Sequence, residues 1–354
     1  MKASSSLHGR GSASNPKNRF EKVERVPEPV DVDEVSSPAT QFLSDSSKTI
    51  IAYNDSPDVG FDASINPYRG CEHGCIYCYA RPTHEYLGFS AGLDFETKIM
   101  VKADAPKLLR EELSNPKWEP KVLAISGVTD CYQPAEKKLE LTRQCLEVLL
   151  EFRNPIAIVT KNYLVTRDID ILSELARYQC AAVIISITTL DEKLSGLMEP
   201  RASRPARRLA AISALSQAGI PVGYLQAPMV PALTDSEAPA IARAAAKAGA
   251  CFAGYVPLRL PYAVKELFEN WLERHYPEKK TKVLNRIRAI RGGKLSDPNF
   301  NSRMRGEGIF AEQMAELFRL ACKKAGISER RPHLTTKHFR RLPKSQLTLF
   351  DAQS

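Results

Sequence analysis

The sequence predicts an α/β fold, in the form of a partial barrel of the TIM type with six strand–helix units and a helical extension at the C-terminus. Six short runs rich in apolar and β-branched residues recur between about residue 60 and residue 260, and helical patterns separate them. Such runs, continuously apolar rather than alternating, are typical of parallel strands that helices cover. Six units are too few to close an eight-stranded barrel, so we expect an open or partial one.

The six expected strands are spaced so that a helix fits between each pair. Ligands in such folds gather at the carboxyl ends of parallel strands, so the residues that follow each run are the first candidates for a site. The runs are DASI (62–65), VLAIS (122–126), IAIVT (156–160), AAVIISIT (181–188), PVGYLQAPMV (221–230) and CFAGYVPL (251–258).

Two of the intervening helices carry clear signals. Over residues 136–152, four leucines fall on one face at helical spacing: Leu139, Leu146, Leu149 and Leu150. Over residues 203–219, Ser203 is expected to cap the helix, with Pro205 in the first turn and Gly219 at the end. After residue 260 the helical stretches are 263–276, 280–293 and 310–326, with no further strand pattern.

Composition divides the chain into four parts. Residues 1–45 are rich in Ser, Pro and charge, and we expect them to be disordered or loosely attached. The barrel core is expected over residues 46–260 and the helical extension over 261–327. The last part, 328–354, is rich in Arg, Lys and Pro and is expected to be a flexible basic tail.

The charge of the chain is unevenly distributed. Its formal net charge is +9, and residues 281–354 hold sixteen Lys and Arg against six Asp and Glu, so they carry the whole excess. This asymmetry favours contact with a polyanion, most readily nucleic acid, although a solvated tail would have the same composition. No apolar run approaches the span of a bilayer, and the first twenty residues lack the apolar core of a secretory signal. Eight cysteines without the density of a disulfide framework favour a reducing cytoplasm.

Three cysteines lie close together after the first expected strand, as Cys71-x3-Cys75-x2-Cys78. Three thiolates on one short loop can hold three irons of a cubane cluster. Clusters that only carry electrons usually have four cysteine ligands, and no fourth cysteine lies near, so one iron would stay open for a cofactor or substrate. The alternative is a structural zinc ion with His73 or His84 as fourth ligand, although a second cysteine knuckle is missing.

This spacing, with an aromatic residue before the last cysteine, resembles the signature of radical S-adenosylmethionine (SAM) enzymes. The surrounding stretch SINPYRGCEHGCIYCYARPTH resembles the branch related to spore photoproduct lyase, in particular a bacterial subgroup of that branch. The resemblance runs from about residue 48 to the C-terminus, and it implies a [4Fe-4S] cluster on Cys71, Cys75 and Cys78 with S-adenosyl-L-methionine on the fourth iron. An external one-electron donor, such as flavodoxin or ferredoxin, would then allow release of a 5′-deoxyadenosyl radical that abstracts hydrogen from a substrate.

The resemblance also implies which side chains contact SAM. Many family members hold its amino group with a Gly-Gly-Glu after the second strand, which is missing here as in the photoproduct-lyase branch. By position, Thr129, Lys161 and Ser186 take over, while Tyr77 and Tyr79 match aromatic residues beside the adenine and the cluster. Lys161 suits the cofactor carboxylate as a point cation. The alternative for Lys161 is an ordinary solvated lysine at the end of a strand. The alternative for Tyr77 is a tyrosine that only packs in the core.

Two further candidates follow expected strands. Arg201 has a guanidinium suited to the ribose or carboxylate of the cofactor or to a substrate phosphate, with Glu199 to orient it, and an ordinary ion pair is the alternative. Cys131 lies in the loop where photoproduct lyase carries a cysteine that returns a hydrogen atom to the product radical. The match is shifted, because that thiol aligns at about Gly127, so Cys131 is either a catalytic hydrogen donor or a buried, inert residue.

Near the C-terminus, QLTLF (346–350) resembles the pentapeptide with which bacterial DNA repair and replication proteins dock on the polymerase sliding clamp. Gln346 would hydrogen-bond a pocket rim, while Leu347, Leu349 and Phe350 would fill an apolar groove. The alternative is that these apolar residues pack on the body of the protein.

These features favour a radical SAM enzyme that acts on nucleic acid, most readily in the repair of a DNA lesion. The basic stretch 291–308 agrees with this interpretation, with Lys294, Arg303 and Arg305 as phosphate contacts, although an ordinary surface loop would look the same. Two alternatives are a radical enzyme that modifies tRNA or protein, and an iron–sulfur redox sensor that binds nucleic acid without turnover.

Overall fold

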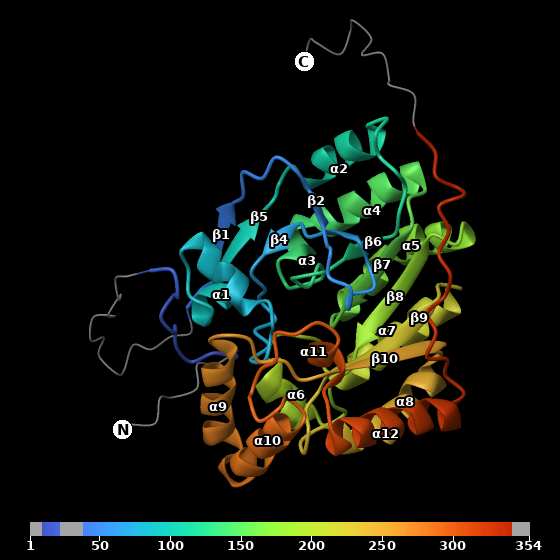
Figure 1. Ribbon diagram of the computed structural model, residues 1–354. Coiled ribbons are helices and arrows are strands. Elements are labelled where there is room, and N and C mark those ends of the chain that lie inside the picture. Colours follow the sequence, from blue (N-terminus) through green and yellow to red (C-terminus); the bar gives the residue numbers. More distant parts are fainter. Residues whose placement is uncertain (1–8, 22–37, 342–354) are drawn as a thin grey trace, which may run out of the picture.

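The main sheet is parallel over six strands, as the sequence predicts. The computed structural model describes residues 9–21 and 38–341 (Figure 1). Every expected run forms a strand, and one further strand pairs antiparallel at the edge, so the predicted α/β fold class is confirmed. In sheet order the strands are β10 (Phe252–Pro257), β9 (Val222–Met229), β8 (Ala181–Ser186), β7 (Ile156–Thr160), β6 (Leu123–Ile125), β3 (Ala63–Ile65) and β2 (Ile51–Tyr53).

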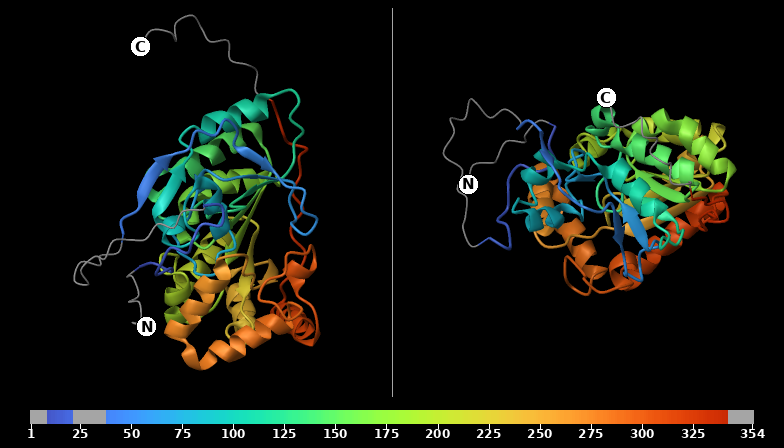
Figure 2. Two further views of the ribbon diagram at one scale, coloured as in Figure 1. Left: turned by 60° about the vertical axis from the view of Figure 1, so that its left-hand side comes forward. Right: turned by 90° about the horizontal axis from the view of Figure 1, so that it is seen from above.

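A row of helices covers the outer face of this sheet, and Figure 2 shows it from two further directions. Neighbours in the row pack on each other: α2 on α4, α4 on α5, α7 on α8 and α8 on α12. All six residues of the central strand β8 are buried, as expected for a strand with packing on both faces. The helices are α2 (Ala105–Ser114), α4 (Leu141–Phe152), α5 (Ile169–Arg177), α7 (Pro205–Gln217), α8 (Ala238–Ala248) and α12 (Ile309–Ala325).

Two details of the predicted helices were wrong. The helix expected over residues 136–152 is divided into α3 (Glu136–Leu139) and α4, because Glu140 between them has a left-handed backbone with φ 52°. Ser203 does not cap α7, although Pro205 lies in the first turn as expected. The Ser203 hydroxyl instead accepts a hydrogen bond from the backbone N–H of Tyr163 at 2.9 Å, so it fastens a neighbouring loop.

The C-terminal helices α9 (Val264–His275) and α10 (Pro277–Ala289) pack against each other below the cysteine loop. They share a hydrophobic cluster with Cys75, Ile76 and Tyr77, in which Trp271 is almost fully buried. Apolar burial of this kind stabilises a folded chain by about 25 cal/mol per Å². The helical extension therefore supports the loop that carries the cysteines. None of the helices in the described parts of the chain combines the length and the apolar character that a bilayer crossing requires.

Parts of the two terminal segments differ from the expectation of disorder. Strand β1 (Gln41–Ser44) pairs in parallel with β5 (Lys98–Val101), which also pairs with β4 (Tyr68–Arg69) in a second small sheet. Residues 9–21 lie against the cysteine loop, through contacts given below. Disorder predicted over residues 1–45 is therefore wrong for residues 9–21 and 38–45.

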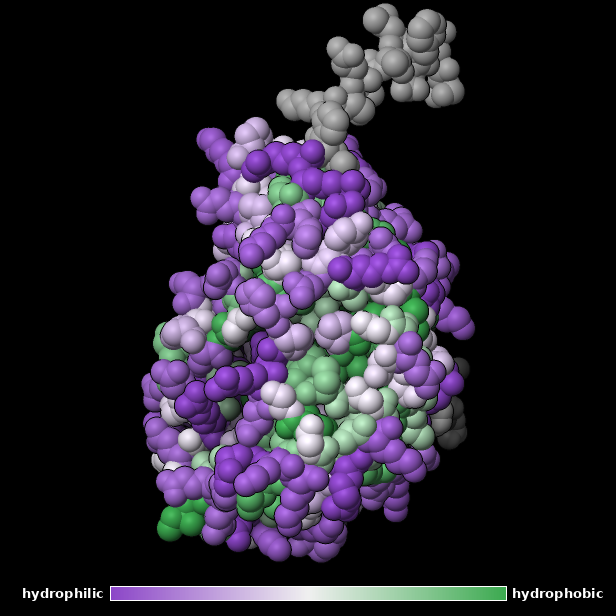
Figure 3. All heavy atoms as spheres, turned by 90° about the vertical axis from the view of Figure 1, so that its right-hand side faces the viewer, coloured by the Kyte–Doolittle hydropathy of each residue, from purple (hydrophilic) through white to green (hydrophobic). Residues whose placement is uncertain are grey.

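The segment 328–341 is not a free tail. Starting from a bridge between Ser328 and Phe252, it crosses the molecule along the amino ends of the parallel strands. The backbone N–H of Thr335 donates to a carbonyl just before β8, and that of Arg340 donates to the carbonyl of the last residue of α4. Arg341 donates to backbone carbonyls just before β6. Figure 3 shows the face that this segment crosses, with an apolar area in the middle and hydrophilic residues around it. The predicted flexible tail is therefore wrong over 328–341, and its clamp-like residues 346–350 lie outside the described residues.

Candidate functional site

The three cysteines lie on the loop that follows β3 and β4, at the carboxyl end of the parallel sheet. Cys71 and Cys75 are buried and Cys78 is half-buried, and all three are free thiols. Burial raises the pKa of each thiol, and mutual repulsion between the three groups adds to this at Cys71. Three close, buried thiols are therefore costly to ionise in the bare protein, and a bound metal cluster removes that cost because it deprotonates its thiol ligands outright.

The donor set suits an iron–sulfur cluster, because thiolates are soft ligands. Within residues 9–21 and 38–341, no group of three or more His, Cys, Asp and Glu side chains is arranged to hold one metal ion. The three thiols of a [4Fe-4S] cluster bind three different irons, so they lie further apart than the ligands of one zinc ion. The donor chemistry, the burial and the mutual proximity of the thiols all suit the cluster.

Both histidines proposed for the zinc alternative have other contacts. His73 lies with Nδ1 3.3 Å from Asp130 and with Nε2 3.1 Å from the Asn162 amide. His84 contacts the Lys98 carbonyl through Nε2 at 2.9 Å and packs edge-on against Phe95. These contacts favour the prediction that both are polar loop residues rather than metal ligands.

Arg81 holds the cysteine loop from inside, and the sequence reasoning did not identify it. Its fully buried guanidinium donates to the carbonyls of Cys75 at 2.9 Å and Gly74 at 3.2 Å. The same group forms an ion pair with buried Glu96 at 2.5 Å. Two loop carbonyls are thus fixed by one charged side chain, and such additional hydrogen bonds make a buried ion pair tolerable.

The N-terminal segment contacts the same pair. Glu96 accepts hydrogen bonds from the backbone N–H groups of Gly11 at 3.0 Å and Ser12 at 2.9 Å. At Gly11 a Cβ atom would lie 1.8 Å from the Gly74 carbonyl oxygen, so only glycine allows the two segments to come this close. Residues 9–21 therefore form a cover over the cysteine loop.

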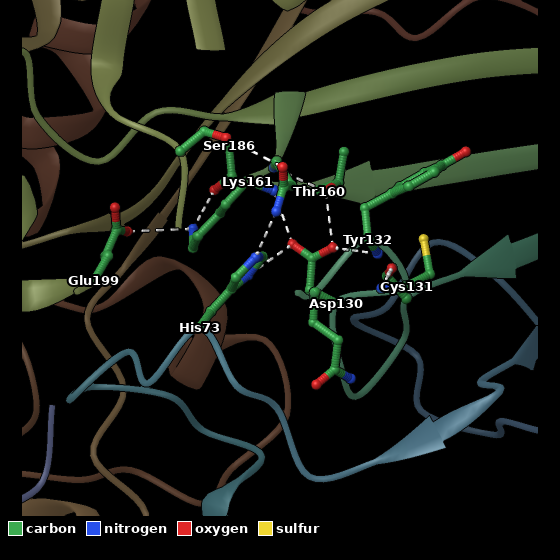
Figure 4. Close-up of polar contacts among 12 residues, drawn as sticks. His73, Asp130, Cys131, Tyr132, Thr160, Lys161, Ser186 and Glu199 are labelled. Carbon is green, nitrogen blue, oxygen red and sulfur yellow. Dashed lines mark hydrogen bonds and ion pairs between the residues drawn. The ribbon is translucent and has the colours of Figure 1, made fainter. Parts of the chain in front are cut away.

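A buried polar cluster lies beside the loop, at the carboxyl ends of β7 and β8 (Figure 4). Lys161 Nζ donates to Ser186 Oγ at 2.6 Å and to the Ala227 carbonyl at 3.0 Å, and it lies 3.6 Å from Glu199. Glu199 also pairs with Arg208, and it accepts a hydrogen bond from the Tyr77 hydroxyl. The structure thus brings together three predicted cofactor-binding residues, Tyr77, Lys161 and Ser186.

Charged groups face one another in this cluster. Burial would raise the pKa of Glu199, but Arg208 and Lys161 outweigh that effect and lower it to about 2, so the carboxylate is ionised. Two cations then face this anion, and Asp130 is a further carboxylate at the backbone of Lys161. The Lys161 ammonium, held at the carboxyl edge of the sheet, suits the carboxylate of an amino-acid group.

Asp130 joins this cluster to the cysteine loop. Its carboxylate accepts hydrogen bonds from Thr160 Oγ1 at 2.7 Å and from the Lys161 backbone N–H at 2.8 Å, and it faces His73. Although burial would raise its pKa, His73 and these hydrogen bonds hold that pKa below the usual value. Asp130 therefore fixes the backbone that carries Lys161.

Three other predicted site residues lie apart from the Lys161 cluster. Thr129 is buried and donates to the Tyr68 carbonyl at 3.0 Å. Tyr79 is 48% exposed, and its hydroxyl donates to the Gly127 carbonyl at 2.7 Å. Cys131 lies in the main hydrophobic core with no exposed surface, and in Figure 4 its sulfur points away from His73 and Lys161. Its burial raises the pKa of the thiol and favours the inert alternative over the hydrogen donor.

Arg201 forms an ion pair different from the one expected. It pairs with Glu72 at 3.0 Å, and not with Glu199, which is occupied by Arg208 and Lys161. Together with Arg10, Arg201 lines a hollow of about 450 Å³ at the surface. The proposed orientation of Arg201 by Glu199 is therefore wrong.

The fold and the site define a class of enzyme. Residues 65–245 match the family model of the Radical SAM superfamily, and the chain belongs to this superfamily. Its members use a [4Fe-4S] cluster and SAM, so the chain is an enzyme of this kind.

Several relatives are similar to this chain over most of its length. The uncharacterized proteins Rv2578c of Mycobacterium tuberculosis and Mb2609c of Mycobacterium bovis are each 35% identical over 248 residues, which is 69% of this chain and 72% of theirs. MJ0683 of Methanocaldococcus jannaschii is 29% identical over 222 residues, 63% of this chain and 79% of its own.

Among solved structures, spore photoproduct lyase complexed with dinucleoside spore photoproduct is similar with a TM-score of 0.59 and 16% identity, over 81% of both chains. A mutant of that lyase with bound AdoMet and dinucleoside spore photoproduct gives a TM-score of 0.53 at 16% identity, over 83% of this chain and 82% of the other. At this identity the likeness shows a shared fold.

Proposed function

We propose that this radical SAM enzyme abstracts hydrogen from a nucleic acid substrate, and that its reaction repairs a DNA lesion. The observation that carries the proposal is the buried cluster of Lys161, Arg208 and Glu199, whose Lys161 ammonium lies beside the three thiols at the carboxyl edge of a barrel. The fold shared with a lyase solved in complex with a dinucleoside spore photoproduct, and the basic excess of residues 281–354, support nucleic acid as the substrate.

In this proposal each side chain of the site has a defined task. Cys71, Cys75 and Cys78 hold the cluster, and Lys161 and Ser186 bind the carboxylate of SAM. When bound and reduced by one electron, the two cofactors supply a 5′-deoxyadenosyl radical. Arg81 and the segment 9–21 hold the loop and exclude water and oxygen from it.

Thr129, Tyr79 and Arg201 have weaker support as cofactor-binding residues, because their side chains contact other groups. Tyr79 is exposed, so its ring is free to contact the adenine or ribose of the cofactor at the edge of the site. Of the three predicted phosphate contacts, Arg303 is occupied by an ion pair with Asp58 at 2.7 Å. Lys294 and Arg305 are exposed.

The cofactor chemistry is tested with anaerobically reconstituted protein, dithionite and SAM. We expect 5′-deoxyadenosine to form, and Cys78→Ala to abolish it together with about a quarter or more of the bound iron. Cys251→Ala is the matched control, because Cys251 is exposed and remote from the loop in sequence. If the wild-type protein never forms 5′-deoxyadenosine, the enzymatic proposal fails and the alternative of a redox sensor without turnover is favoured.

The substrate is tested with deuterated pools of DNA, RNA and peptide. We expect deuterium from DNA to pass into 5′-deoxyadenosine, since the abstracted hydrogen leaves the substrate with its label. Transfer from RNA alone or from peptide alone would instead establish a tRNA- or protein-modifying enzyme and would overturn the DNA-repair proposal.

The proposed partners follow from this function. The electron comes from an external donor such as flavodoxin or ferredoxin, and residues 346–350 dock on the polymerase sliding clamp. All eight cysteines are free thiols, which supports a reducing compartment such as the cytoplasm. Deletion of residues 346–350 should abolish binding to purified clamp, and unchanged binding would refute the docking motif.

A further inference from the structure

Arg259 occupies the mouth of the barrel next to the cysteine loop. It follows β10, the last parallel strand, by two residues, so it lies at the same carboxyl edge as the Lys161 cluster. Its guanidinium carbon is 5.4 Å from the centre of the Tyr79 ring, and Tyr79 directly follows Cys78 in the chain. A group bound by Arg259 would therefore lie close in space to the loop that carries the cysteines.

The guanidinium of Arg259 lacks a strong acceptor. It has five N–H donors, yet in the described part of the chain its one hydrogen bond is from Nη1 to the Met304 sulfur, at 3.2 Å. A thioether is a weak acceptor. No carboxylate among residues 9–21 and 38–341 lies within ion-pair distance of it. A half-buried cation in this state costs free energy unless a ligand completes it.

Among the described residues, two neighbouring arginines have oxygen acceptors, although Nε of Arg291 lacks a partner, whereas Arg259 has only a sulfur. Arg303 makes two hydrogen bonds to Asp58, at 2.7 Å each, and Arg291 donates to four backbone carbonyls. Asp58 is the nearby carboxylate that could have served Arg259, but it is occupied by Arg303. Burial and the charge of Arg303 lower the pKa of Arg259, and the more distant carboxylates of Asp58 and Asp297 offset only part of this effect.

The pair of Asp58 and Arg303 also shows that this is the mouth. Asp58 lies between β2 and β3 at one edge of the sheet, and Arg303 in α11 (Ser302–Arg305) follows β10 at the other edge. Their ion pair therefore bridges the open side of the partial barrel. The Arg259 guanidinium lies close to this bridge and to the Tyr79 ring next to the cysteine loop.

We propose that Arg259 binds a backbone phosphate of the nucleic acid strand and so positions the reacting nucleotide at the cluster loop. The inference rests on the proposed function, and it identifies the residue that fixes the substrate. The planar fork of the guanidinium matches two phosphate oxygens, and the ligand supplies the missing negative charge. The basic excess of the chain draws the strand to this mouth.

The test measures binding of a fluorescent single-stranded oligodeoxynucleotide to reconstituted holoenzyme with SAM, by anisotropy over a range of salt concentrations. Arg259→Gln should weaken binding several-fold and reduce the slope of log affinity against log salt by about 0.7, the value for one phosphate contact. Arg259→Lys should keep the slope and lose part of the affinity, because the charge stays but the fork is lost. Arg243→Gln, on the exposed face of α8, removes the same charge and should change neither quantity.

A second measurement identifies the phosphate itself. In the wild-type protein, one methylphosphonate that neutralises the contacted phosphate should weaken binding, and in Arg259→Gln the same replacement should have no further effect. If Arg259→Gln binds with the wild-type affinity and slope while the wild-type protein transfers deuterium from DNA, the assignment of Arg259 fails and the nucleic acid function stands. If the wild-type protein does not bind the oligodeoxynucleotide yet forms 5′-deoxyadenosine, both are overturned.

Discussion

Replacement of Arg81 by glutamine should lower the free energy of unfolding by about 3–5 kcal/mol, the range for a buried ion pair that loses one partner. Both side chains of the pair with Glu96 are fully buried, at 0% exposure, and the N···O distance is 2.5 Å. The variant also removes donors from the Cys75, Gly74 and Gly92 carbonyls. Glu96 keeps two backbone N–H donors from the N-terminal segment, which places the expected value toward the lower end of the range.

The assay is urea denaturation of the metal-free protein, followed by circular dichroism. Arg110→Gln is the matched control, because Arg110 pairs with Glu151 at the same 2.5 Å distance but with side chains 45% and 41% exposed. Exposed pairs contribute about 0–1 kcal/mol, so this variant should change stability by less than 1 kcal/mol. Equal losses in the two variants would refute the reasoning that burial of the Arg81 pair decides its contribution.

Three further predictions concern other buried groups. Glu199→Gln should flatten the acid dependence of the free energy of unfolding, because the pKa of Glu199 is lowered to about 2 in the native protein. The carboxylate then contributes on the order of 3 kcal/mol, which is present above pH 4.5 and lost as the pH falls toward 2. A curve of urea midpoint against pH that is the same in the variant and the wild type would contradict this prediction. His84→Gln should remove a loss of stability between pH 6.5 and pH 4, because burial lowers the pKa of His84 to about 4 and the unfolded chain takes up the proton first; the same titration of unfolding measures it. Cys131→Ala should keep the rate of 5′-deoxyadenosine formation within about twofold and lower the free energy of unfolding by about 1 kcal/mol. If the variant is as stable as the wild type but no longer returns a hydrogen atom to the product radical, Cys131 is the hydrogen donor.

The strands of the barrel could be predicted from the sequence because their burial leaves a local record. A parallel strand covered on both faces favours a largely apolar run, and the six runs follow this rule with few polar exceptions, such as Ser64 and Gln226. The rule that ligands gather where such strands end indicated the region of the site, and the resemblance to the photoproduct-lyase branch then selected Lys161 and Ser186 within it. The break at Glu140 could not be predicted, because a single left-handed residue leaves the apolar spacing of 136–152 unchanged.

The terminal segments were missed for the opposite reason. Residues 9–21 and 328–341 have no periodicity, and they are held by hydrogen bonds to partners far away in sequence, such as those from Gly11 and Ser12 to Glu96. Arg81 and Glu96 were missed because a buried ion pair has no pattern of its own. The one available signal was charge inside otherwise apolar surroundings, at Arg81 next to the cysteine motif.

The path of residues 328–341 also sets where a bound partner would sit. This segment is fastened along the amino ends of the strands, and Arg341 is held at carbonyls just before β6. The cysteines and Arg259 lie at the carboxyl ends, on the other side of the sheet. A protein that binds the chain beyond Arg341 would thus be attached at the amino ends of the strands. The carboxyl ends, with the cysteines and Arg259, would remain accessible to a nucleic acid strand while the enzyme is bound to that partner.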